Sequence, residues 1–185
     1  AASRKILVIG SGGQLGRALA ESFSDATYVE FVDYPEFDIA SASLPTARPW
    51  RDYATIINAA AYTGVDAAET VDGRATAWAV NVTALTALAR IATEHGITLV
   101  HVSSDYVFDG KSSRPYREVD PLCPLGVYAQ TKAAGDQIVA TVPRHYIVRT
   151  SWVIGDGKNF VRTMRSLADQ GVNPSVVDDQ LGRLT

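Results

Sequence analysis

Tyr128 and Lys132 are the first pair of residues in the sequence whose types and spacing can do chemistry. They lie four positions apart in a stretch predicted to be a helix over about 127–141, so both side chains emerge on one face. A nearby ammonium group favours the phenolate and moves the pKa of a tyrosine down from roughly 10. We therefore expect Lys132 to lower the pKa of Tyr128 and the pair to act in proton transfer.

A hydroxyl group is expected close to this pair. Ser103 and Ser104 follow a predicted strand over 98–102, and catalytic groups gather at the carboxyl ends of strands in open α/β sheets. A serine at that place can hold a carbonyl oxygen. Two serines after a strand also form ordinary caps and turns, so the residues alone leave both interpretations open.

A glycine-rich loop follows the first predicted strand, 5–9, and precedes a predicted helix over about 14–23. Its glycines Gly10, Gly13 and Gly16 follow the pattern Gly-x-x-Gly-x-x-Gly. Glycine permits a tight turn and a close backbone approach, and the free N–H groups at a helix N-terminus attract a phosphate. This context favours a dinucleotide site over a plain glycine turn.

An acidic residue, Asp33, ends the second predicted strand, 27–33. A carboxylate there accepts the ribose hydroxyls of a dinucleotide and disfavours a 2′-phosphate, which indicates NADH. Arg4 or Arg17 can still accommodate NADPH, so both cofactors remain open. An aspartate at a strand end is also a common turn residue.

The elements that must position these residues alternate along the chain. Further strands are expected at 55–57, 98–102, 146–148 and 176–177, and further helices at about 74–94 and 160–168. Alternation of this kind predicts an α/β fold with a doubly wound parallel sheet, Rossmann-like, because parallel strands need helical crossovers. We expect residues 1–185 to form one domain.

Composition excludes several classes of protein. With 46% hydrophobic residues, 20% charged residues and a net charge of -3, the chain has the balance of a soluble globular protein and no bias toward nucleic acid. No membrane segment is expected, and one cysteine, Cys123, predicts a free thiol and a cytoplasmic location. His95, His101 and His145 lack metal-ligand spacing, so no metal is expected. The sequon at 81–83 is interpreted as ordinary residues.

Six short segments, taken together, match one known family. They are 10–16 (GSGGQLG), 58–63 (NAAAYT), 103–110 (SSDYVFDG), 128–132 (YAQTK), 149–152 (RTSW) and 178–182 (DDQLG). On these motifs the chain resembles the dTDP-4-dehydrorhamnose reductases, a branch of the extended short-chain dehydrogenases/reductases. The segment 103–110 is specific to this branch, whereas the glycine loop and the Tyr/Lys pair occur more widely.

The resemblance implies an activity: reduction of the C4 ketone of dTDP-4-dehydro-6-deoxy-L-mannose to dTDP-L-rhamnose by NADPH or NADH. In it, Tyr128 protonates the developing alkoxide, Lys132 lowers the pKa of Tyr128 and holds the nicotinamide ribose, and Ser104 binds the carbonyl oxygen. The resemblance also assigns contacts. The substrate is contacted by Asp105 and Trp152, and the pyrophosphate by Gly13, Gln14 and Leu15. The adenosine ribose is contacted by Asp33, the adenine by Asp38 and Ile39, and the nicotinamide half by Ala61, Tyr62 and Thr63.

The chain departs from the family pattern in two ways. Ser104 stands where many members carry threonine, which keeps the hydroxyl. Members continue into a small C-terminal substrate lobe, so we expect that lobe to be largely missing after 185, and a homodimer, if formed, to use regions outside this chain. Two alternatives stay open: a non-catalytic regulatory subunit of methionine adenosyltransferase, and a reductase or epimerase of another nucleotide sugar.

Overall fold

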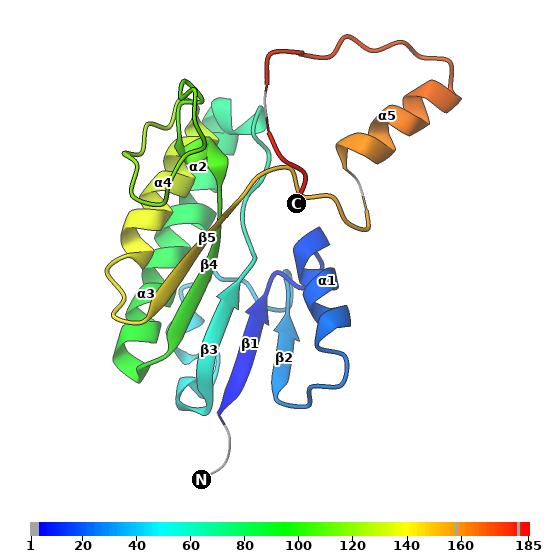
Figure 1. Ribbon diagram of the computed structural model, residues 1–185. Helices are drawn as coiled ribbons and strands as arrows, with labels where there is room; N and C mark the ends of the chain where they lie inside the picture. The colour runs from blue at the N-terminus through cyan, green and yellow to red at the C-terminus, as the bar shows by residue number, and fades with distance from the viewer. Residues whose placement is uncertain (1–3, 158, 181) are drawn as a thin grey trace.

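The computed structural model describes residues 4–157, 159–180 and 182–185, and its centre is a parallel sheet. The strands lie in the order β2-β1-β3-β4-β5, and every neighbouring pair is parallel. Figure 1 shows them pointing the same way, so all their carboxyl ends meet at one edge. The bounds are β1 Lys5–Ile9, β2 Val29–Val32, β3 Tyr53–Asn58, β4 Thr98–Ser104 and β5 His145–Thr150.

The helices of the fold cover the sheet unequally. Helices α2, α3 and α4 pack on one face, while α1 lies on the other side, beside β1 and β2 (Figure 1). On the open part of that second face, Tyr146 and Val148 of β5 remain exposed. The bounds are α1 Gln14–Ser22, α2 Val71–Trp78, α3 Ala84–His95, α4 Val127–Val139 and α5 Phe160–Asp169.

The main core fills the space between the sheet and helices α3 and α4. Leu7 and Ile9 on β1, Ile56 on β3 and Leu99 on β4 are almost fully buried, and they meet Leu88 of α3. Burying a side chain of this size contributes about 1.5–3 kcal/mol relative to exposure. The core therefore fixes the strands whose ends carry the site.

The helix expected over about 74–94 exists, but it contains an irregularity that the sequence does not announce. Between α2 and α3 the chain makes a π-helical turn at Ala79–Thr83, and Asn81 in that turn is buried. Such turns are rare and occur often at functional sites. By length and composition alone the run Val71–His95 could cross a membrane, but Leu85, Leu88 and Ile91 are buried in the fold, which explains its apolar character.

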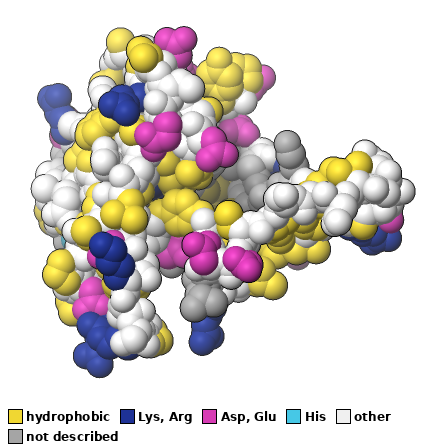
Figure 2. All heavy atoms as spheres, turned by 90° about the horizontal axis from the view of Figure 1, so that it is seen from above, with side chains coloured by type: hydrophobic (Ala, Val, Ile, Leu, Met, Phe, Trp, Pro, Cys, Tyr) yellow, Lys and Arg dark blue, Asp and Glu magenta, His cyan; other side chains and the backbone are white. Residues whose placement is uncertain are grey.

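The C-terminal part corrects one sequence expectation. Val176 and Val177 do not form a strand, since both are exposed and lie in extended chain that follows α5. Instead, Leu184 pairs with Trp152 in a short parallel bridge. Helix α5 has no buried residue and stands away from the sheet, and Figure 2 shows hydrophobic side chains exposed along this projecting arm.

Candidate active site

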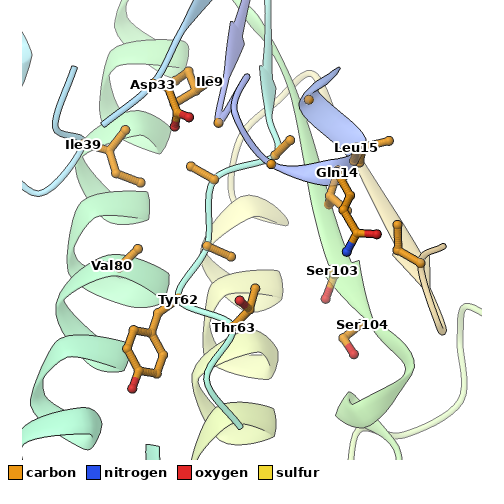
Figure 3. A pocket seen from close by; sticks show the side chains of 18 of the residues that line it. Ile9, Gln14, Leu15, Asp33, Ile39, Tyr62, Thr63, Val80, Ser103 and Ser104 are labelled. Carbon is orange, nitrogen blue, oxygen red and sulfur yellow. The ribbon is translucent and has the colours of Figure 1, made fainter. Parts of the chain in front are cut away.

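The strongest candidate site lies where the direction of the sheet order changes. The chain leaves β1 toward β2 on one side and leaves β2 for β3 on the other, so a crevice opens above β1 and β3, the usual place for a ligand in such sheets. A cavity of about 600 Å³ occupies this place. In Figure 3, Asp33 and Ile39 lie at one end, Tyr62 and Thr63 along one wall, and Ser103 and Ser104 at the other end.

The glycine loop lines this cavity, and a side chain at Gly10 or Gly16 would collide with neighbouring backbone. Gly10 has φ +88°, and a Cβ there would stand 2.6 Å from the backbone nitrogen of Ala60. A Cβ on Gly16 would overlap the carbonyl oxygen of Gly10. The N-cap of α1, Gly13, has no side chain to satisfy the first N–H groups of the helix. Those groups and the positive end of the helix dipole are thus free to bind an anion.

Asp33 is fixed at the far end of the cavity by the glycine loop. Its Oδ2 accepts the N–H of Gly12 at 2.7 Å, and its Oδ1 accepts the N–H of Tyr34 at 3.0 Å. The predicted Asp38 lies at the same end, together with Phe37, which the sequence analysis missed. A carboxylate held between two backbone amides keeps its charge in a defined place.

A second cavity, of about 820 Å³, adjoins the first. It is lined by Asp105 and Trp152, two of the residues that the resemblance assigns to substrate, and by Asp179 and Gln180 near the C-terminus. Asp105 accepts a hydrogen bond from Ser151 Oγ at 2.7 Å, which orients its carboxylate. Leu181, in the motif 178–182, lies outside the described residues.

Tyr128 stands at the junction, because it lines both cavities. It lies in the first turn of α4, and its ring meets that of Tyr106 edge to face at a centroid distance of 6.0 Å. Burial raises the pKa of Tyr128 above its ordinary value, against a smaller opposite effect of the Ser104 hydroxyl. The phenol is therefore protonated at neutral pH and can donate its proton.

The structure does not show the expected lowering of the pKa of Tyr128 by Lys132. Lys132 does share a face of α4 with Tyr128 and lines the same cavity, but its Nζ donates to Val102 O at 2.7 Å and lies 3.3 Å from His101 Nε2. The side chain is only 2% exposed, and burial lowers the pKa of Lys132 itself to about 8. The pKa of Tyr128 is raised rather than lowered.

Two sets of buried polar contacts were missing from the sequence analysis. Asn81, taken there as ordinary, bonds both the N–H and the C=O of Tyr62 and also Thr131 Oγ1. It thereby ties the loop after β3 to α4. On the other side of α4, buried Asp136 pairs with Arg149 at 2.9 Å. A polar residue within an otherwise apolar helical stretch was the available signal for both.

The first cavity collects every residue predicted to contact cofactor. They come from segments that are far apart in the sequence (10–16, 33–39, 61–63 and 128–132), and the fold brings these segments together. Among the described residues no group of three or more His, Cys, Asp or Glu could hold a metal ion, and Cys123 is free and exposed. The predicted residues lining the cavity are Gly10, Gly13, Gln14, Leu15, Gly16, Asp33, Asp38, Ile39, Ala61, Tyr62, Thr63, Ser104, Tyr128 and Lys132.

The parallel sheet and the glycine loop at its switch point place the chain among the Rossmann-like α/β proteins. A family model described as the RmlD substrate binding domain matches residues 4–185, and the chain belongs to that family. The chain is 42% identical over 187 residues to a dTDP-4-dehydrorhamnose reductase of Aggregatibacter actinomycetemcomitans, across 96% of this chain and 62% of that one. It is 41% identical to the enzyme of that name from Mycobacterium tuberculosis (strain CDC 1551 / Oshkosh), across 99% and 62%.

Solved structures agree with this assignment. A dTDP-4-dehydrorhamnose reductase from Clostridium acetobutylicum matches with a TM-score of 0.84 and 36% identity over 90% of this chain and 60% of that one. A Bacillus anthracis dTDP-4-dehydrorhamnose reductase in complex with NADP matches with a TM-score of 0.83 and 34% identity, over 91% and 60%. The chain therefore spans about 62% of the length of the curated relatives described above.

Proposed function

We propose that the protein is an NADPH- or NADH-dependent reductase that converts the C4 ketone of dTDP-4-dehydro-6-deoxy-L-mannose to the alcohol of dTDP-L-rhamnose. One observation carries the proposal: Tyr128, a partly buried phenol, lies where two cavities meet. The relatives' names supply the substrate, and the NADP complex of the Bacillus anthracis protein supports the cofactor. Residues 1–185 would form the NAD(P)-binding domain of this reductase. A cytoplasmic location stays a prediction.

The residues of the first cavity fit a dinucleotide. A cradle of glycine backbone, the uncapped N-terminus of α1 and a fixed carboxylate at Asp33 match a pyrophosphate and an adenosine ribose in chemistry and order. Gly10, Gly13 and Gly16 supply the cradle. When bound, the cofactor supplies a hydride to the ketone carbon.

The chain's own residues supply the proton and orient the ketone. Tyr128 would give its phenolic proton to the carbonyl oxygen as negative charge develops there, and Ser104 would donate a hydrogen bond to the same oxygen. Ser104 lines the first cavity, while its neighbour Asp105 lines the second. The end of β4 thus reaches both cavities, which suits residues that hold a sugar ketone beside the cofactor.

Lys132 would act from a buried position. Its Nζ is anchored on the carbonyl of Val102, and Lys132 lines the first cavity, where a further N–H of the ammonium group would donate to the nicotinamide ribose. A positive charge at this depth would also stabilise the tyrosinate left after proton transfer. The effect that the family implies for Lys132 thus stays a prediction.

Asp33 should set a preference for NADH over NADPH, because its charge opposes a 2′-phosphate. We expect Asp33→Asn to raise the ratio of kcat/KM for NADPH to that for NADH by about tenfold or more. The amide keeps an oxygen that can accept the Gly12 N–H, so the loop should stay in place. Steady-state kinetics with both cofactors measures the ratio. Asp25→Asn, in the exposed turn before β2, is the matched control and should change nothing.

The function itself is tested by direct assay. Purified protein is incubated with the dTDP-ketosugar and NADPH or NADH, and both cofactor oxidation and sugar product are measured. Formation of dTDP-L-rhamnose is the expected result. Cofactor binding without reduction of any nucleotide ketosugar would contradict the proposal and favour the regulatory-subunit alternative. Turnover of a different nucleotide sugar would correct only the substrate.

A further inference from the structure

A line of buried polar side chains leads from the end of β3 to Lys132. Asn58, at the end of β3, places its Nδ2 3.2 Å from His101 Nδ1, and His101 places its Nε2 3.3 Å from Lys132 Nζ. All three side chains are 2% exposed. At the other end, Asn58 Oδ1 accepts the backbone N–H of Ala60, which lines the first cavity.

Donors and acceptors in this line can be counted. Because Asn58 Oδ1 accepts from Ala60, the amide NH₂ faces the ring, and His101 Nδ1 must be the acceptor. A neutral imidazole carries one proton, which is then on Nε2 and points at Lys132 Nζ. That contact is a hydrogen bond only if the lysine is a neutral amine, since an ammonium group has no acceptor.

The ammonium form of Lys132 requires the opposite arrangement. His101 Nε2 must then accept, so the ring proton moves to Nδ1 and faces Asn58. Asn58 satisfies it only by turning its oxygen to the ring, which gives up the hydrogen bond from Ala60. A buried polar group without a partner destabilises the fold, so the three residues are expected to change together.

We propose that His101 is a positioning residue that couples the proton on Lys132 to the orientation of the Asn58 amide, and so to the backbone of residues 59–63 at the cavity wall. The proposal rests on the proposed function only in giving Lys132 a role in turnover. Protonation of Lys132 and the shape of the cofactor wall then respond to each other.

The surroundings of His101 keep the ring neutral and leave Lys132 as the group that titrates. Burial and the charge of Lys132 hold the pKa of His101 well below 6.5. Burial lowers the pKa of Lys132 to about 8, against Asp136, one turn further along α4, which raises it. Asp136 is itself paired with Arg149 of β5. Asn81, in the π-helical turn, is neutral and donates a hydrogen bond to Thr131 of α4.

The absence of a side chain at Gly135 makes room for this arrangement. A Cβ on Gly135 would stand 3.7 Å from His101 Nε2 and 2.9 Å from the carbonyl oxygen of Asn81. Helix α4 therefore approaches both β4 and the π-helical turn closely at this point. The ring of His101 has a fixed place between β3 and α4.

The test is the tautomer of His101, measured by long-range ¹H–¹⁵N spectra of the imidazole nitrogens between pH 7 and 10. The signals of His101 are assigned by their loss in His101→Gln. We expect the Nδ1–H tautomer below the pKa of Lys132, near pH 8, and the Nε2–H tautomer above it. The amide signal of Ala60 should shift with the same midpoint. His145, whose Nδ1 contacts Val142 O, provides an Nδ1–H reference in the same spectra.

Lys132→Met is the decisive comparison, because it removes the titrating amine and keeps an unbranched side chain. In this variant His101 should stay in the Nε2–H form across the range, held by Asn58, and Ala60 should not respond. A single tautomer throughout in the parent protein, or an unchanged transition in Lys132→Met, would overturn the proposal. The spectra need neither substrate nor cofactor, so the result stands even if the protein reduces no ketosugar.

Discussion

The Tyr128→Phe variant should bind NADPH or NADH within a few-fold of the parent protein and lose ketone reduction by a factor on the order of 10²–10⁴. The change removes one oxygen, and the edge-to-face contact with Tyr106 needs only the ring. Apart from Tyr128, the cofactor cavity is formed by many other residues, mostly from other elements. Cofactor fluorescence titration and kcat with the dTDP-ketosugar measure the two effects separately.

A matched control distinguishes loss of the proton donor from general damage. Tyr146→Phe removes the same atom from a side chain that is 65% exposed on β5, outside both cavities, and should leave kcat unchanged. Retention of full activity in Tyr128→Phe would exclude Tyr128 as the donor. A parallel loss of cofactor affinity and of thermal stability would mean that the hydroxyl is structural.

The raised pKa of Tyr128 changes how the pair with Lys132 is understood. A spacing of four residues correctly puts both on one face of α4, but spacing cannot tell where a lysine head group is held. The carbonyl of Val102 and the ring of His101, both on β4, fix Nζ. These partners come from a strand more than twenty-five residues away, so no local pattern in the sequence reveals them.

Other features of the fold could be predicted because their causes are local. The apolar run 5–9, the glycines after it and the helical spacing of Leu15 and Leu19 are neighbours in sequence, and the structure has β1, the loop and α1 in that order. The strand predicted at the two valines 176–177 is wrong, because a strand does not depend on the local sequence alone. Their β-branched side chains favour a strand, but a strand also needs a partner, and they lie in exposed chain.

The candidate site likewise has features that can be predicted from the sequence and features that cannot. Glycines that admit a close approach and an acidic strand end are recognisable because each has its own residue type and context. The arrangement of two cavities around Tyr128 cannot be recognised from the sequence, because Ser104 and Asp105 are adjacent in sequence yet line different cavities. Alternation along β4 and the turn after it sends neighbouring side chains in different directions.

The pair of buried Asp136 and partly buried Arg149 gives the second large expected effect, on stability. Asp136 is 1% exposed, and its second oxygen, Oδ1, has no hydrogen-bond partner among the described residues. Arg149 also donates to the carbonyl of Glu118 and covers the ring of Phe108 at 5.3 Å, so it joins α4 to the loop beside the second cavity. Removing the arginine leaves a buried charge without its partner.

We therefore expect Arg149→Met to lower the free energy of unfolding by about 3–5 kcal/mol, measured by urea denaturation. The double variant Asp136→Leu with Arg149→Met should recover most of that loss, because the uncompensated charge is gone. Arg162→Met is the control: its pair with Asp156 is exposed, and such pairs contribute about 0–1 kcal/mol. Equal losses in Arg149→Met and Arg162→Met would show that burial of Asp136 does not govern the cost. Failure of the double variant to recover would instead assign the loss to the contacts of Arg149 with Glu118 and Phe108.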